Sequence, residues 1–269
     1  MALIVVVVAV VGFVAGAYIG GPLLTGGGTE LTTIVVGTNT PFPPFESRNP
    51  TSGDLEGLDI DMMNEIGKRS NWNIVWRDFQ DWDALLAAIE FRGVDIGASS
   101  ITSSGSVGAQ RNNSFDFSDW YYEADQAILI KSGTTTVQCA ASECTVDELA
   151  NHTVAVQTLT SSYWWIIGEL VDTGKTPESM VSDFGSVSSV VQELTNGNVE
   201  WVLVDKPIAE KLVQQNSQLQ IEGTLETNEL YAFAVADGDP QHLIPAINSA
   251  LAGMKQDGKY QQILDKWLG

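Results

Sequence analysis

Two successive sets of strands and helices are predicted by the pattern of hydrophobic and polar residues. In the first set, short apolar runs have the length of buried strands, and the segments between them repeat apolar residues at helical spacing. Ile60, Met63 and Ile66, for example, share one face of a helix. The elements predicted here, in chain order, are strand 33–37, a helix capped by Asp59 or Asp61, strand 74–76, helix 81–91 and strand 94–98.

The second set continues the alternation to the C-terminus. Its predicted elements are strand 127–130, helix 146–149, strand 154–156, a helix after Thr160-Ser161-Ser162, helix 187–194, strand 201–204, helix 206–214, strand 231–235 and helices 240–254 and 258–268. Alternation of this kind favours a parallel sheet with ligand sites at the carboxyl ends of its strands. Two such sets predict an α/β chain of two lobes with a cleft between them.

Candidate binding chemistry follows the strand at 94–98. Ser99, Ser100 and Thr102 come directly after it, and Arg111, one of 13 basic residues in the chain, follows them. Hydroxyl and main-chain N–H groups suit the oxygens of an anion, and a guanidinium can hold a carboxylate with two parallel hydrogen bonds. The alternative is an ordinary serine-rich loop with a solvated arginine. Because Pro-Pro-Phe-Glu (43–46) and the turn at Trp82 also fall at strand ends, we favour a carboxylate pocket.

The acidic composition limits the classes of partner. Thirteen basic and 34 acidic residues give a net charge of −21 and an isoelectric point near 4.1, and 44% of the residues are hydrophobic. Such a charge repels nucleic acid and anionic lipid, so we expect neither as a partner. A solvated acidic surface accounts for the charge without any specific cationic partner.

Two local features indicate a location outside the cytoplasm. Residues 2–24 carry no charge, which predicts either an uncleaved membrane anchor or a signal peptide, with a Gly-rich linker up to residue 28. Cys139 and Cys144 are the two cysteines of the chain, and their close spacing predicts one small disulfide loop. The two histidines, His152 and His242, lie far from them in sequence, so we expect no metal site.

Eight motifs arrive in the order found in one protein family. They are VVGTNT-PFPPFE, GLDIDMMNEI, DWDALLAAI, FRGVDIGASSIT, R-x5-FS-DWYY, VAVQTLTSS, NGNVEWVLVDKPIAEKL and MKQDGKYQQILDKWLG. From about Thr33 onward the chain therefore resembles the solute-binding proteins of ABC transporters, specifically the polar amino-acid group, family 3. The resemblance implies the type II periplasmic-binding-protein fold for residues 29–269. Lobe one would be about 31–124 and 230–269, lobe two about 125–229, with crossings near 123–127 and 226–229.

The resemblance also implies roles for individual residues. Arg111 matches the arginine that binds the ligand α-carboxylate, assisted by Ser99, Ser100 and Thr102, and Asp205 matches the acid that binds the α-ammonium. The remaining predicted contacts are donors from lobe two at Thr160 and Ser161, and a side-chain pocket walled by Phe42, Phe45 and Trp82, of which Phe45 could equally be core.

Three departures from the family pattern bear on these roles. Asn39 stands in the segment where many members have Gly-Thr-Asp, which favours a neutral or acidic polar ligand over a cationic one, although Glu46 can restore a negative pole. About four extra residues, 105–108, precede Arg111, so we expect that loop to bulge. Leu159 stands where the family usually has a glycine, directly before Thr160. This difference affects the predicted position of the backbone donors at Thr160 and Ser161.

The leading functional hypothesis is capture of an amino acid outside the cytoplasm for delivery to an ABC permease. An enzyme on the same scaffold, such as a cyclohexadienyl dehydratase, is one alternative, but no nucleophile–base pair, metal cluster or cofactor motif is visible. A sensory domain that acts with a partner is another. We expect no catalytic residue, no metal and no cofactor.

Overall fold

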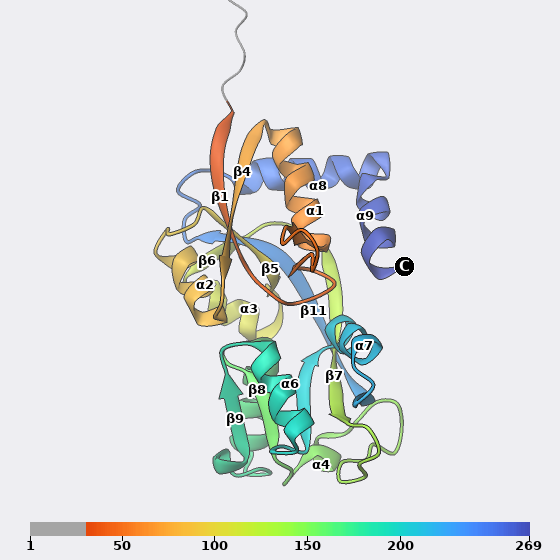
Figure 1. Ribbon diagram of the computed structural model, residues 1–269. Helices are drawn as coiled ribbons and strands as arrows, with labels where there is room; N and C mark the ends of the chain where they lie inside the picture. The colour runs from red at the N-terminus through yellow and green to blue at the C-terminus, as the bar shows by residue number, and fades with distance from the viewer. Residues whose placement is uncertain (1–30) are drawn as a thin grey trace, which may run out of the picture. The chain divides into compact units, whose positions relative to one another are not determined.

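Strands and helices alternate along the residues that the computed structural model describes, 31–269 (Figure 1). The strands are β1 (Thr32–Asn39), β2 (Ser47–Arg48), β3 (Leu55–Glu56), β4 (Trp72–Phe79), β5 (Ile96–Thr102), β6 (Phe115–Phe117), β7 (Tyr122–Lys131), β8 (Val154–Gln157), β9 (Val181–Phe184), β10 (Trp201–Asp205) and β11 (Leu219–Ala236). The α-helices are α1 (Leu58–Ser70), α2 (Trp82–Glu90), α3 (Gly105–Arg111), α4 (Val146–Leu149), α5 (Ser161–Ile166), α6 (Val187–Asn196), α7 (Lys206–Gln215), α8 (Ile244–Asp257) and α9 (Lys259–Leu268).

One mixed sheet runs through both sets of elements. Its strand order is β4-β1-β5-β11-β7-β10-β8-β9, with β6 paired to β11. The neighbours of β1 and of β8 are parallel to them, but β11 is antiparallel to β5 and β7, and β7 is antiparallel to β10. The expectation of a parallel sheet is therefore correct only for the two outer parts, and the middle of the sheet is antiparallel.

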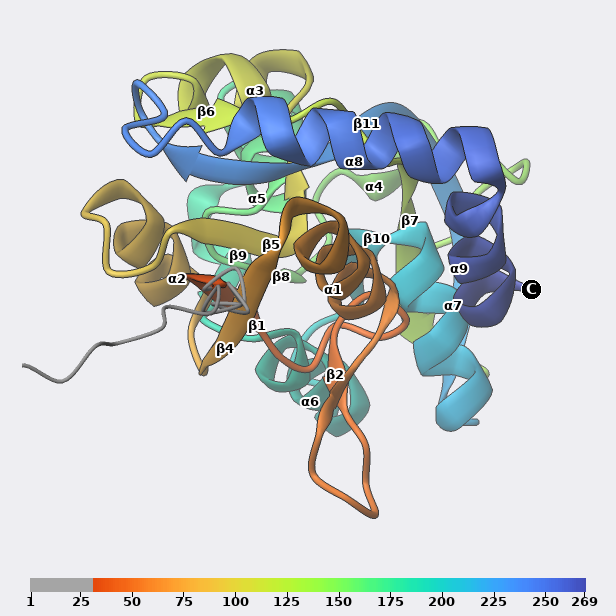
Figure 2. The same cartoon turned by 90° about the horizontal axis from the view of Figure 1, so that it is seen from above.

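Helices cover both faces of each part of the sheet. In the first part, α1 covers one face of β1 and β5 and α2 covers the other (Figure 2). Ile34 and Ile96 pack against Met62 of α1, and Ile101 packs against Leu85 of α2. Because successive side chains of a strand point to opposite faces, two apolar helices can share one strand. The ends of these strands are thereby fixed between two packed layers.

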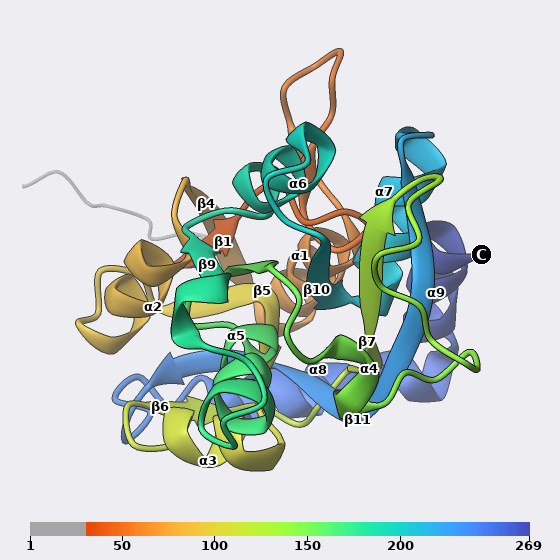
Figure 3. The same cartoon turned by 90° about the horizontal axis from the view of Figure 1, so that it is seen from below.

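The second part repeats this arrangement with different helices. Helix α5 covers one face of β8 and β10, and α6 covers the other (Figure 3). Val156 and Trp201 pack with Ile166 of α5, and Ala155 packs with Val190 of α6. The side chains of these strand residues are buried. Asp205 is the last residue of β10, so its position is fixed by a strand whose two faces are both covered.

Two long strands, β7 and β11, connect the two parts of the sheet (Figure 1). They pair with each other over most of their length, and their register shifts between Leu225 and Glu229. The crossings expected near 123–127 and 226–229 lie within these two strands. Such an irregularity bends the strand that carries it.

Most predicted elements are present, and several have different ends. Helix α1 begins at Leu58 with Gly57 as its cap residue, so the expected capping by Asp59 or Asp61 is wrong. The predicted disulfide between Cys139 and Cys144 is present. The anchor or signal segment predicted at 2–24 lies outside the described residues. Within 31–269, every helix is too short or too polar to span a membrane.

Candidate functional site

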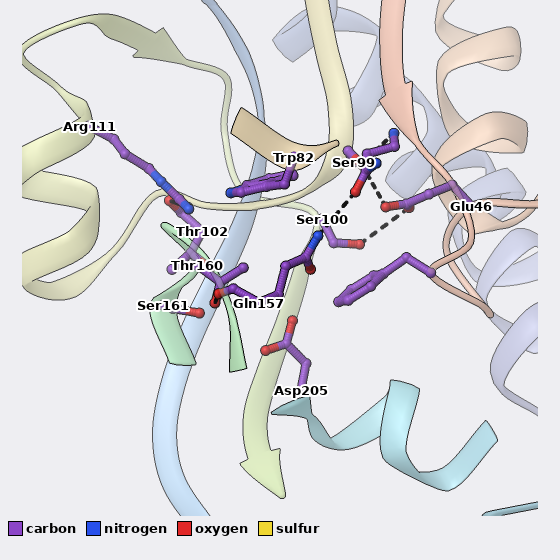
Figure 4. A pocket seen from close by; sticks show the side chains of 12 residues that line it. Glu46, Trp82, Ser99, Ser100, Thr102, Arg111, Gln157, Thr160, Ser161 and Asp205 are labelled. Atoms are coloured by element: carbon purple, nitrogen blue, oxygen red, sulfur yellow. Dashed lines mark hydrogen bonds between the residues drawn. The ribbon is translucent and has the colours of Figure 1, made fainter. Parts of the chain in front are cut away.

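One pocket brings together ten of the side chains that the sequence predicts for the site (Figure 4). It contains about 320 Å³ of space outside the protein atoms, a volume that includes the solvent at its opening. Its predicted lining residues are Asn39, Phe42, Trp82, Ser99, Ser100, Thr102, Arg111, Thr160, Ser161 and Asp205, and Glu46 and Gln157 complete it.

Arg111 reaches the pocket from the last position of α3. Its Nη1 donates to the carbonyl oxygen of Thr102 at 2.9 Å and its Nη2 to that of Leu159 at 3.2 Å, while the guanidinium lies 5.5 Å from the centre of the Trp82 ring. Burial lowers the pKa of Arg111 to about 10, against the opposing effect of Glu229 and Asp205, so the side chain stays charged at neutral pH. A buried, oriented guanidinium is suited to a carboxylate.

The residues inserted before Arg111 form a helix and not the expected bulging loop. They make up most of α3, whose first residue, Gly105, has a φ of 65°. A Cβ atom at Gly108 would lie 2.1 Å from the carbonyl oxygen of Ser103, so this turn requires glycine. The insertion therefore places Arg111 through a short helix packed on the end of β5.

The hydroxyl residues at the end of β5 already have partners within the protein. Ser99 Oγ donates to Glu46 Oε1 at 2.7 Å and accepts from the N–H of Asn39 at 3.0 Å. Ser100 has a φ of 50°, and its N–H donates to Asp59 Oδ2 at 2.8 Å. A left-handed conformation is uncommon for a residue other than glycine and requires such support. That these residues bind a carboxylate stays a prediction.

Two buried acids, Glu46 and Asp59, support this wall of the pocket. Burial raises the pKa of Glu46 well above its usual range, Asp59 adds to the shift, and bonds from Ser99 and Ser100 oppose it. Burial likewise raises the pKa of Asp59 to about 7, although bonds from Ser100 and Tyr121 lower it. Asp59 Oδ1 is buried and has no hydrogen-bond partner among the described residues. A share of Asp59 is therefore neutral near pH 7, and Glu46 holds its proton more readily than an exposed glutamate.

Asp205 lies on the opposite side of the pocket and is held by two side chains. Its Oδ1 accepts from Gln126 Nε2 and its Oδ2 accepts from Tyr231 Oη at 2.5 Å. Burial raises the pKa of Asp205 to about 7, and the nearby Glu229 adds to this shift, while both hydrogen bonds and Arg111 oppose it. Sequence reasoning missed Gln126, Tyr231 and Glu229, because they contact Asp205 and Thr102 only through the pairing of distant strands.

The segment between β8 and α5 closes the pocket from the second part of the sheet. Thr160 is the cap residue of α5, and its Oγ1 accepts from the N–H of Tyr163. Gln157, which the sequence analysis did not single out, donates to Asn39 Oδ1 at 3.3 Å. Leu159 has a φ of 55°, a conformation that favours the glycine expected there, and its carbonyl accepts from Arg111 and from Trp82 Nε1. The two walls are therefore in direct contact.

The aromatic residues differ in their positions. Phe42 and Trp82 line the pocket, and Trp82 also donates its main-chain N–H to Gly185 of the facing wall at 3.2 Å. Phe45 does not line it: its ring is fully buried, with edge contacts to Tyr122 and Tyr231 at centroid distances of 5.0 and 5.3 Å. Of the two interpretations of Phe45, core packing is the correct one.

Comparison with known proteins identifies the family. The family model for bacterial extracellular solute-binding proteins, family 3, matches residues 34–269. The chain is 30% identical over 237 residues to the ABC transporter glutamine-binding protein GlnH of Bacillus subtilis, covering 87% of this chain and 81% of that protein. It is also 30% identical over 235 residues to a probable histidine-binding protein of Neisseria gonorrhoeae, covering 86% of this chain and 81% of that one.

Solved structures show the same arrangement of strands and helices. An ancestral arginine-binding protein bound to arginine superposes with a TM-score of 0.77 at 32% identity, covering 88% of this chain and 98% of that one. The arginine-, lysine-, histidine-binding protein ArtJ of Geobacillus stearothermophilus superposes with a TM-score of 0.75 at 29% identity. This match covers 88% of this chain and 96% of that one. The fold is therefore the type II periplasmic-binding-protein fold, and the chain belongs to the bacterial extracellular solute-binding proteins of family 3.

Proposed function

We propose that this protein binds a polar amino acid outside the cytoplasm and delivers it to an ABC-type importer. The supporting observation is the single pocket that has the Arg111 guanidinium on one side and the Asp205 carboxylate on the other. A free amino acid carries one carboxylate and one ammonium group, so these two charges can each meet their complement. The relatives named for glutamine and histidine, and the arginine-bound neighbour, support the same class of ligand.

A neutral side chain fits the lining better than a charged one. Asn39 takes the place of the expected acid, with its Nδ2 donating to the carbonyl of Phe79 and its Oδ1 accepting from Gln157. Glu46 has a raised pKa and holds a proton more readily than an exposed glutamate. Among the described residues that line the pocket, Arg111 is the one cation, which leaves no counter-charge for an acidic side chain.

Hinged closure of two lobes would sequester the ligand. Lobe one comprises about 31–124 and 230–269 and lobe two about 125–229, with the hinge in β7 and β11. A zwitterion that contacts both Arg111 and Asp205 binds more tightly when the lobes are closed. It therefore shifts the equilibrium toward the closed arrangement by that difference in affinity. The family supports a binding role and not catalysis, so the expectation that the chain is not an enzyme is confirmed.

A thermal-shift panel tests this function. The full chain is stripped of carried-over ligand by unfolding and refolding and is then tested with each standard amino acid. An amino acid at a hundred times its dissociation constant adds about 2.7 kcal/mol to the free energy of unfolding, a rise of about 5–10 °C for a protein of this size. We expect such a rise with one or a few polar amino acids, and no rise with any of them on folded protein would refute the proposal.

A further inference from the structure

Glu229 is a buried carboxylate that does not line this pocket but lines an adjoining cavity, which shares Thr102 and Ser161 with it. Only 6% of its surface is exposed, and it lies on β11 where the register shifts. Its Oε2 accepts from Thr102 Oγ1 at 2.8 Å, and its Oε1 accepts from Gln126 Nε2 at 2.8 Å and from Thr227 Oγ1 at 3.3 Å. It therefore contacts a pocket residue of β5 and the amide that holds Asp205, from a position between them.

The hydrogen bond to Glu229 determines whether the Thr102 hydroxyl can donate or only accept a hydrogen bond from a ligand. A hydroxyl has one hydrogen, and Thr102 donates it to the Glu229 carboxylate. The oxygen is left with lone pairs only, so on the side of the pocket it can accept a hydrogen bond and cannot donate one. An acceptor repels a carboxylate and suits an ammonium group.

The second bond of Glu229 fixes the Gln126 amide. Gln126 Oε1 accepts from Ser162 Oγ at 2.6 Å, which sets the orientation of the amide, and its Nε2 donates both to Glu229 and to Asp205. The two hydrogens of one amide nitrogen thus join the two carboxylates. Glu229 and Asp205 together place two acidic groups near the single guanidinium of Arg111, which favours a cationic group on the ligand.

We propose that Glu229 is a positioning residue that makes the pocket selective for ligands with an α-ammonium group. It does so by holding the Thr102 hydroxyl as an acceptor and by holding, through Gln126, the Asp205 carboxylate. The inference rests on the proposed amino-acid binding, and it extends that function by naming a residue outside the pocket that determines which charge the ligand must carry.

The test compares Glu229→Gln with Glu226→Gln, an exposed glutamate on the same strand. The probes are the standard amino acids, one at a time, each paired with the 2-hydroxy acid that keeps its carboxylate and side chain but carries a neutral hydroxyl in place of the ammonium. Affinities are measured by calorimetric titration, directly or by competition. Circular dichroism and urea unfolding show whether each variant is folded.

In Glu229→Gln, we expect the affinity for the amino acid to fall by about tenfold or more, because a charge-assisted hydrogen bond is lost. The affinity for the hydroxy acid should change little. Glu226→Gln should leave both affinities unchanged. An equal fall for both probes indicates a merely structural role and overturns the inference, as does no change for either. If the unaltered chain binds no amino acid, the proposed function fails and the inference fails with it.

Thr102→Val provides a second route if Glu229→Gln does not fold. Valine keeps the shape of threonine and removes the hydroxyl that receives its orientation from Glu229. We expect the same selective fall in affinity for the amino acid. Where both single variants fold, the double variant should lose little more than either alone, since the two residues act through one hydrogen bond. Additive losses would contradict the assignment.

Discussion

The pocket has a pair of buried acids on each side, and the two pairs are supported in different ways. Glu46 and Asp59 receive their hydrogen bonds from Ser99, Ser100 and Tyr121, all in the first part of the sheet or directly beside it. All hydrogen-bond donors to this pair therefore come from one wall of the pocket. Its bonds hold the left-handed turn at Ser100 in place, which is a requirement of the fold.

Asp205 and Glu229 depend on elements from both parts of the sheet. Their partners come from β5, β7 and β11, and the bonds span up to 127 residues of sequence. Of the two, Asp205 faces the pocket. A carboxylate whose surroundings come from both parts of the sheet is suited to respond to the proposed ligand. We therefore expect the first pair to stabilise the fold and the second pair to determine ligand binding, Asp205 by direct contact and Glu229 through Thr102 and Gln126.

The largest expected effect is loss of binding in Asp205→Ala and in Arg111→Ala. Removing one partner of a buried charge pair costs about 2–5 kcal/mol, so the affinity for the amino acid identified by the panel should fall at least about thirtyfold. Calorimetric titration measures this loss, and circular dichroism confirms that the variants fold. Asp183→Ala, an exposed position, is the matched control. Binding near the unaltered affinity in either variant would remove that residue from the site.

The next effect concerns stability and falls on the other pair. Asp59→Ala leaves the buried Ser100 N–H and Tyr121 hydroxyl without their acceptor, at about 1–3 kcal/mol for each group. We expect the free energy of unfolding without ligand to fall by about 3 kcal/mol in urea titrations. Asp54→Ala, an exposed position, should change it little. A stable Asp59→Ala variant with lost binding would reverse the roles assigned to the two pairs.

The pH dependence of stability and that of binding should have opposite signs. Folding raises the pKa of Asp59 and Asp205 from 3.8 to about 7. Their contribution to the free energy of unfolding is therefore complete below pH 4 and is lost as the pH rises through 7. Binding of an ammonium requires ionised Asp205, so affinity should rise about tenfold between pH 6 and pH 8.

Asp59→Asn separates these two slopes. Asparagine does not titrate, so this variant should flatten part of the stability profile measured by urea unfolding across pH. The affinity profile should keep its slope, because Asp205 is unchanged. A flattened affinity profile in Asp59→Asn would show that the two pairs titrate together and would weaken the distinction between them.

The smallest effect is expected for Leu159→Gly. The hydrogen bonds from Trp82 and Arg111 go to the carbonyl of residue 159, which glycine keeps. Glycine adopts the left-handed conformation without strain, which stabilises the folded state by about 1 kcal/mol. Its greater freedom in the unfolded chain destabilises the folded state by about the same amount. Stability should stay within about 1 kcal/mol and affinity within about threefold. A tenfold loss of affinity would show that the leucine side chain itself contacts the ligand.

The sequence predicts the residues of the pocket better than their surroundings. Ten of the predicted residues surround one pocket because the carboxyl ends of strands β1, β5 and β10 converge there, as expected of an α/β sheet. That these residues bind the ligand stays a prediction. The hydrogen bond between Thr102 and Glu229 joins residues 127 positions apart, and no periodicity in the sequence indicates such a contact.

Helix α3 and the first half of β11 are among the elements that the sequence does not predict, together with the short strands β2, β3, β6 and β9. Helix α3 contains two glycines, which each cost about 1 kcal/mol in a helix relative to alanine, and its seven residues show no apolar face. The first half of β11 was missed because its register shifts after Ile221 and after Leu225 interrupt the alternation of a regular strand. The sequence predicts Asp59 as a helix cap because a buried acid at the start of a helix has the same sequence pattern as a capping acid.

The central claim is that one pocket binds both charged groups of a free amino acid. The most direct measurement is calorimetric titration of the unaltered full chain with the amino acid identified by the panel, with its amide, which lacks the carboxylate, and with its 2-hydroxy acid, which lacks the ammonium. We predict that both analogues bind at least about a hundredfold more weakly, since each leaves a buried charge unpaired. Binding of either analogue within about tenfold of the amino acid would contradict the account.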